Sequence, residues 1–216
     1  MKIDITVPNN LNEITLRQYK HFLKIQKNVD DEKFLNAKII EIFCGVKLPH
    51  VMRLKVTDTE LIVKTLTEMF EQKPRLLKHF KLNGVSYGFH PQLDDLTLGE
   101  YIDLDTFIGD WENIEKAMAV LYRPVVNRLK DKYIIEEYKL GKDDLLLDMP
   151  MEAVLSSIFF LWNLGLDLSE AMMKYLEKAE GQTLTKHHNS LLNGDGTTQF
   201  LASLVETLQD MKISLN

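Results

Sequence analysis

The stretch from Asp94 to Val125 constrains the fold more than any other part of the sequence, because the signals that start and stop two helices agree within it. Thr97 is followed three residues later by Glu100. This spacing is a capping box, in which each side chain satisfies a backbone N–H left open at the start of a helix. The box predicts a helix that begins at Leu98.

A second helix is predicted directly after the first. Asp110 is a suitable N-cap for it. Apolar residues then recur at the three- and four-residue spacing of one buried helix face, namely Trp111, Ile114, Met118, Leu121 and Tyr122. Pro124 predicts its end, because a proline disfavours helical geometry in the residue before it.

Similar signals predict three helices before this stretch. Capping-box patterns at Thr15–Gln18 and Thr57–Glu60 open two of them, and another is expected from about Asp31 to Cys44. The residues expected to face the core are Leu16, Tyr19, Phe22, Leu23 and Gln26, then Phe34, Leu35, Ile39, Ile42 and Phe43, and finally Leu61, Thr65, Leu66, Met69 and Phe70.

Strand signals are few. Polar and apolar residues alternate from Ile3 to Val7, which predicts a short edge strand. Between Leu76 and Phe89 the period is again two, and Asn83-Gly84 at its centre suits a type I′ turn, so this range predicts a β-hairpin. A further short strand is expected at Tyr133–Ile135.

The last third of the chain is predicted to be helical with one break. A helix is expected from Met149 to Leu164, and Asp167 with Glu170 opens the next, which ends near Gly181. Residues 182–198 are small and polar and read as a flexible linker, and residues 199–213 as an amphipathic C-terminal helix. The predicted fold is therefore mainly α with a small β component: a compact helical domain over residues 1–181 with an inserted β-hairpin, plus a C-terminal helix on a flexible linker.

Composition narrows the class of protein. A 45% hydrophobic and 27% charged chain of 216 residues is typical of globular proteins. Its net charge of -6 argues against a nucleic-acid-binding surface, and one cysteine excludes an intramolecular disulfide. No signal peptide is visible, and the apolar run Ser157–Leu166 is shorter than the roughly 20 residues of a membrane span. These features predict a cytosolic protein with no membrane partner.

Patterns that carry chemistry are weak throughout the sequence. Helix capping and solvation explain the acids between Asp94 and Asp105. Glu137-Tyr138-Lys139 resembles the acid and lysine arm of a metal-dependent nuclease, which we keep as a distant third hypothesis. His187-His188 has no metal-ligand spacing, and no phosphate-binding glycine loop or activated nucleophile is present. The sequence predicts no catalytic, cofactor-binding or metal-binding residues.

The C-terminal helix carries the candidate binding site. Its apolar residues form one stripe, made of Phe200, Leu201, Leu204, Val205, Leu208 and Met211. The stripe can fold back on its own domain, or it can enter a groove on another protein. We take these residues as the candidate partner-binding site.

Several phrases of the sequence resemble proteins encoded beside the structural genes of tailed bacteriophages, above all crass-like phages and other phages of Bacteroidota. These phrases are ITLRQYKHFLKI near the start, LTLGEYIDLDTFI and AMAVLYRPV in the stretch described first, and then KYIIEEY and SIFFLWNLG. The resemblance covers roughly Ile3 to Tyr175 and brings no catalytic residue with it.

The resemblance implies a non-enzymatic phage morphogenesis protein that binds another phage structural protein, such as a tail, portal or capsid component. A tail or virion assembly chaperone in the host cytoplasm is the first expectation. The alternative is a structural component of the virion, such as a ring, connector or packaged protein near the portal.

Overall fold

The computed structural model describes residues 4–130, 132–139, 141 and 143–179. Its longer helices are α1 Leu16–Gln26, α2 Glu32–Phe43, α4 Val56–Phe70, α5 Leu98–Phe107, α6 Ile114–Leu121 and α7 Met151–Ala179. Short helical turns are η1 Leu11–Glu13, α3 Leu48–Val51, η2 Leu93–Asp95 and η3 Asp143–Asp148. The strands are β1 His79–Leu82, β2 Val85–Phe89, β3 Tyr122–Leu129 and β4 Lys132–Ile135.

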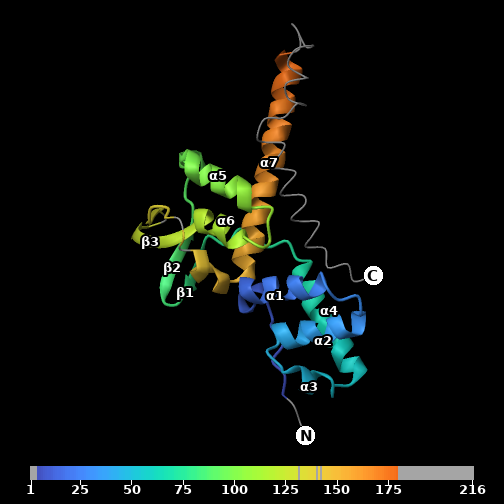
Figure 1. The fold of residues 1–216 in the computed structure, drawn as a ribbon. Helices are drawn as coiled ribbons and strands as arrows, with labels where there is room; N and C mark the ends of the chain where they lie inside the picture. The colour runs from blue at the N-terminus through green and yellow to red at the C-terminus, as the bar shows by residue number, and fades with distance from the viewer. Residues whose placement is uncertain (1–3, 131, 140, 142, 180–216) are drawn as a thin grey trace.

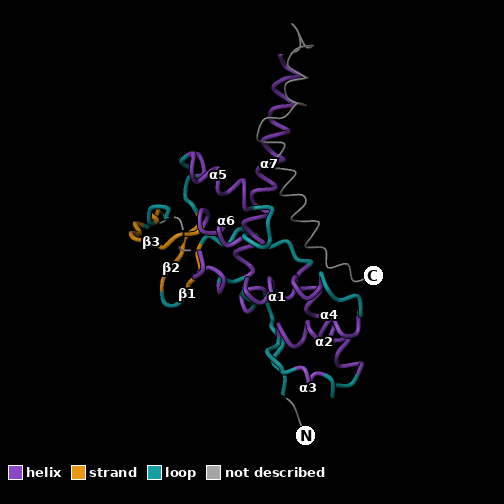
Figure 2. Tube along the Cα trace, in the orientation of Figure 1, coloured by secondary structure: helices purple, strands orange, loops and turns teal. Residues whose placement is uncertain are grey.

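Helices dominate and one small sheet is inserted among them, which confirms the predicted class, mainly α with a small β component. Figure 1 shows α1 to α4 on one side of the base of α7, and the sheet with α5 and α6 on the other. The strands gather at one flank of the molecule (Figure 2). From its base, α7 runs out beyond all the other elements (Figure 1).

Aromatic rings join the first helices to the rest of the core. The ring of Tyr19 in α1 lies 5.3 Å from that of Phe70 in α4 and 5.1 Å from that of Trp111. Phe22, one turn further along α1, lies 5.6 Å from Phe43 in α2. All these ring pairs are tilted, and their centroids lie at ordinary distances for aromatic contacts.

Two of the three early helices start as predicted. The Thr15–Gln18 capping box is present at α1, and Asp31 caps α2 by accepting from two backbone N–H groups. Phe34 was wrongly expected to face the core, because its side chain is 38% exposed near the start of α2. Thr57 does not cap α4, which begins one residue before it with Lys55 as an N-cap that makes no side-chain bond. Leu61, also expected inward, is exposed.

The predicted hairpin is confirmed as β1 and β2. Asn83 and Gly84 join the strands with φ of 50° and 80°, as a type I′ turn requires. The predicted strand at residues 133–135 is confirmed within β4. No strand forms in residues 4–7, the described part of the expected edge strand, so that prediction is wrong there.

The sheet is larger than the sequence predicted, because β3 was missed. The strand order is β1-β2-β3-β4, with all neighbours antiparallel, and Tyr87 in β2 stands opposite Pro124 in β3. Helix α6 ends at Leu121, and the chain passes straight into β3 at Tyr122. Pro124 therefore lies inside a strand instead of terminating a helix.

Helix α5 begins at Leu98 behind an intact Thr97–Glu100 capping box, as predicted. The start of the next helix was placed too early. The Asp110 carboxylate accepts a 2.9 Å bond from the Glu112 N–H within a turn, and α6 begins only at Ile114.

Helix α7 is continuous from Met151 to Ala179, so the break predicted between Leu164 and Asp167 is wrong. Its start is anchored to the start of α1. The Met151 N–H donates to the Ile14 carbonyl at 2.8 Å, and the Leu16 N–H donates to the Met149 carbonyl at 3.0 Å. The first half of α7 is the centre of the core, where Ala153, Val154 and Ile158 have no exposed surface.

Candidate functional site

A buried ion pair lies between α5 and β3. The Arg123 Nη1 donates to Glu100 Oε1 at 2.8 Å, and the two side chains are only 8% and 6% exposed. The other Glu100 oxygen accepts from both the N–H and the hydroxyl of Thr97, each at 2.8 Å. Glu100 thus completes the capping box of α5 and also pairs with Arg123, the residue before Pro124.

Burial and nearby charges shift the pKa values of Glu100 and of His90 beside it. Burial alone would raise the pKa of Glu100, but the hydrogen bonds from Thr97 and the charge of Arg123 outweigh it and lower that pKa. Burial lowers the pKa of His90, and the positive charge of Arg123 lowers it further. His90 is therefore neutral and Glu100 ionised near neutral pH.

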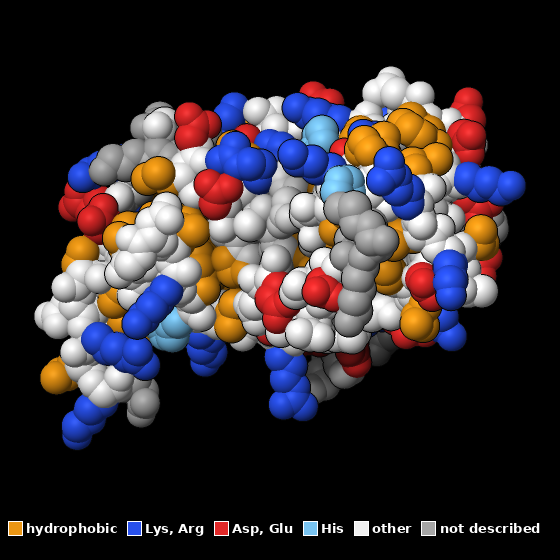
Figure 3. Space-filling model, turned by 90° about the horizontal axis from the view of Figure 1, so that it is seen from below, with side chains coloured by type: hydrophobic (Ala, Val, Ile, Leu, Met, Phe, Trp, Pro, Cys, Tyr) orange, Lys and Arg blue, Asp and Glu red, His pale blue; other side chains and the backbone are white. Residues whose placement is uncertain are grey.

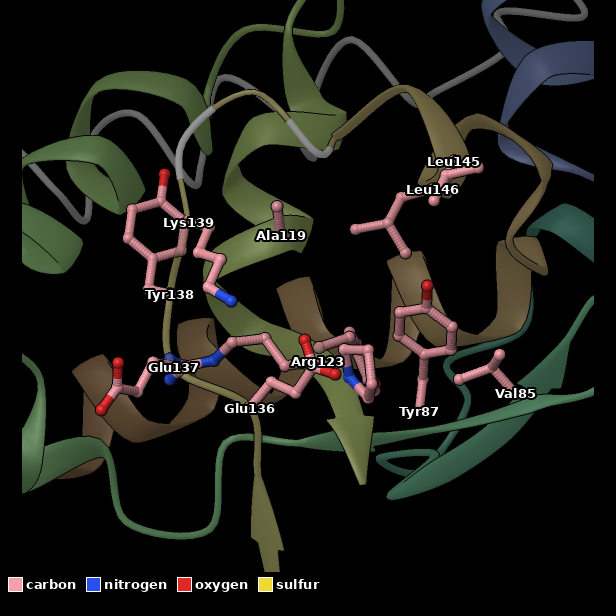
Figure 4. Close-up of a pocket in the computed structure, with 12 residues that line it drawn as sticks. Val85, Tyr87, Ala119, Arg123, Glu136, Glu137, Tyr138, Lys139, Leu145 and Leu146 are labelled. Atoms are coloured by element: carbon pink, nitrogen blue, oxygen red, sulfur yellow. The ribbon is translucent and has the colours of Figure 1, made fainter. Parts of the chain in front are cut away.

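Beside the pair lies a cavity of about 210 Å³, shown in Figure 4. Arg123 of β3 lines this cavity, together with Glu136, Glu137 and Lys139 of the segment after β4. Leu145 and Leu146 of η3 line the opposite side (Figure 4). Tyr138 ties this segment to α5, since its hydroxyl donates to an Asp103 carboxylate oxygen at 2.8 Å.

The chemistry of this cavity is limited by its size and its mixed charge. Small-molecule sites usually enclose about 300–1,000 Å³, so this cavity of about 210 Å³ is smaller than most of them. The structure does bring Glu137 and Lys139, the residues of the nuclease hypothesis, to one cavity. In the described part of the chain, however, no group of three His, Cys, Asp or Glu residues is arranged to hold a metal ion.

Exposed apolar side chains form a second kind of candidate site. On α5, Leu98, Tyr101 and Ile102 are exposed at helical spacing. On α7, Leu164 and Leu168 are 44% and 50% exposed. With Ala171 they follow a four- and three-residue spacing along one face, which we call the α7 stripe.

The opposite end of the molecule has a different surface. Figure 3 looks at that end from below, where acidic and basic side chains are interspersed among hydrophobic ones. Exposed apolar residues of α3, α4 and the turn between them include Met52, Val56 and Leu61. Neither sign of charge dominates this face, so it offers no extended electrostatic field.

The predicted partner-binding residues lie outside the described part of the chain. These are Phe200, Leu201, Leu204, Val205, Leu208 and Met211, together with the linker 182–198. What the structure does place is the helix from which that segment leaves. Over Met151–Ala171, α7 is the one described helix long and apolar enough to cross a membrane, a test that core helices of soluble proteins also pass.

Comparisons with known proteins give little further information. No protein family and no solved structure matches the chain. It is similar to a lysine–tRNA ligase of Thermosipho melanesiensis, with 25% identity over 181 residues. The match covers 75% of this chain but 34% of the ligase, so the chain spans about a third of that enzyme. A likeness this distant establishes no family membership.

Proposed function

We propose that this chain is a non-enzymatic phage morphogenesis protein that binds another phage structural protein through its C-terminal stripe, as a tail or virion assembly chaperone does. The phage origin is supported by the sequence phrases described above. The binding role is supported by the one-sided apolar pattern of the C-terminal stripe.

The observation that carries the proposal is the one-sided apolar pattern of the C-terminal segment beside a core that the described residues share. Tyr19 of α1, Ile114 and Leu121 of α6 and Ile158 of α7 are at most 1% exposed and belong to one cluster of buried residues. We propose that the six apolar residues of the C-terminal stripe lie outside this cluster. A helix with one apolar side that its own core does not need is the usual form of a helix that binds in a groove.

The experiment is capture from phage-infected cells with the full-length tagged protein. Leu204→Asp combined with Leu208→Asp places two charges in the stripe, and we expect it to abolish capture of the phage structural protein. Ala202→Asp with Gln209→Asp adds two carboxylates on the other side of the same helical segment and is the matched control. Equal capture by both double variants would contradict the proposal.

The alternative role, a structural component of the virion, uses the same binding surface but has a different fate. Mass spectrometry of purified particles separates the two roles. We expect the protein to be absent or present in traces, as a chaperone would be. A stoichiometric amount in mature particles would establish the structural role instead.

A further inference from the structure

The outer half of α7 has no neighbour among the described residues that buries it. From Asn163 to Ala171 no residue is buried, whereas Ile158 and Leu161, just before this range, are buried. Leu166 is exposed on the side opposite the α7 stripe, so the helix is open on both sides. In the sequence, the spacing of the stripe continues from Ala171 to Tyr175.

The chain itself supplies a segment that can reach this surface. The described part of α7 ends at Ala179, and residues 180–199 can span at most about 66 Å when extended. The helix rises only about 22 Å between Leu164 and Ala179. The segment that follows can therefore reach any point on the outer half of α7.

The two apolar stripes also share a spacing. Leu164, Leu168 and Ala171 are four and three residues apart, and so are Leu204, Leu208 and Met211. Each stripe occupies one side of its segment. Packing one against the other removes both from water, as in a pair of helices that pack side by side.

We infer that the C-terminal stripe of this chain docks on the α7 stripe of the same molecule when no partner is bound. Docking within one molecule is favoured over docking on a second copy, because a flexible tether holds the segment at an effective concentration of about millimolar. The inference deepens the proposed function, since it states where the stripe rests before a partner takes it. Its test needs no partner.

The test is disulfide trapping in the full-length protein. Cys44, the native cysteine, is first replaced by alanine. Leu204→Cys is then combined in turn with Leu164→Cys, Leu168→Cys or Ala171→Cys, because a disulfide forms only between Cα atoms less than about 7 Å apart. In the control, Glu206→Cys replaces Leu204→Cys, which moves the thiol about 200° around a helix.

We expect at least one Leu204→Cys pair to oxidise to a monomeric, cross-linked chain at least about tenfold faster than its Glu206→Cys control. Disulfide-linked dimers in place of cross-linked monomers would overturn docking within one molecule and indicate a second copy. No difference between stripe and control pairs would overturn the docking altogether. Capture of the phage protein would remain a separate measurement in either case.

Hydrogen exchange gives an independent reading without cysteines. Backbone amides of residues 164–171 should exchange more slowly in the wild-type protein than in the Leu204→Asp, Leu208→Asp variant, because a docked segment suppresses local opening of α7. The Ala202→Asp, Gln209→Asp control should exchange like the wild type. Identical exchange in all three proteins would overturn the inference even if the proposed function holds.

Discussion

Replacing Glu100 by glutamine should be among the most damaging single changes in the described part of the chain. The substitution keeps the shape of the side chain but removes the charge that Arg123 faces at 2.8 Å. Arg123 is 7% exposed, and its Nε already has no hydrogen-bond partner among the described residues. Without the carboxylate, the guanidinium would stay buried and lose its ion-pair partner.

The magnitude follows from this burial. Removing one partner of a buried ion pair typically costs about 3–5 kcal/mol, because the other charge remains desolvated. We expect Glu100→Gln to lose about that much free energy of unfolding. Arg123→Met should lose less, about 1–3 kcal/mol, because Glu100 keeps both hydrogen bonds from Thr97. The double variant should be more stable than Glu100→Gln alone.

Urea unfolding of the two single variants and the double variant measures this coupling as a double-mutant cycle. The Arg17–Asp148 pair is the control, with an N–O distance of 2.7 Å but side chains 55% and 47% exposed. Asp148→Asn should cost only about 0–1 kcal/mol, since water screens that pair. If Glu100→Gln costs no more than Asp148→Asn, the argument from burial is refuted.

Further perturbations follow from the same packing. Trp111→Ala should cost about 3–5 kcal/mol by leaving a cavity, and Thr97→Ala about 1 kcal/mol by removing a cap, so thermal melts that show the reverse order would contradict the described core. Gly88→Ala should destabilise the sheet, because its new Cβ would lie 2.7 Å from the Tyr133 ring, and a lower urea midpoint checks this. Stability should fall as the pH drops below about 6.5, because the unfolded chain protonates His90 before the folded one does, and His90→Asn should flatten that dependence in urea titrations.

The sequence predicted most of the helices because their signals are local. A capping box involves two residues three positions apart, and the boxes at Thr15 and Thr97 are both present. The same pattern at Thr57 failed, since α4 starts one residue earlier and places that threonine inside its first turn. A local pattern therefore indicates that a helix begins nearby, but not always at which residue.

The features that the sequence did not reveal depend on contacts between distant residues. The first part of strand β3 contains a proline and follows a helix without a loop, and it pairs with β2, about 35 residues earlier, while the rest of β3 pairs with β4. The ion pair of Glu100 with Arg123 has the same origin, because nothing local in the sequence brings α5 to β3. A rule based on spacing along the chain has no access to either contact.

The unbroken course of α7 has a different explanation. Gly165 and the Asp167–Glu170 pattern both indicate a helix boundary. A glycine costs only about 1 kcal/mol within a helix. The buried first half of α7 already holds the turns before Gly165 in place, so the helix can continue through the glycine without a new nucleation step. The Ser169 hydroxyl also donates to the Gly165 carbonyl at 2.9 Å within the next turn. The boundary signals are present, but packing outweighs them.

Truncation after Gly181 tests whether the core is complete without the C-terminal segment. If the stripe served the core, its loss would cost about 1.5–3 kcal/mol for each large apolar side chain removed. In a chain of this size 1 kcal/mol shifts the melting temperature by about 2–4 °C, so the loss of several such side chains would lower it by well over 10 °C.

We expect instead that the truncated protein folds and melts within a few degrees of the full chain. Tyr19, Ile114 and Ile158 belong to one cluster of buried described residues, and the α7 stripe that the truncation uncovers lies outside this cluster. Circular dichroism melts of the full-length and truncated proteins, measured side by side, provide the comparison. A truncated protein that melts far earlier, or does not fold, would mean that the C-terminal stripe belongs to the core and is not free to bind a partner.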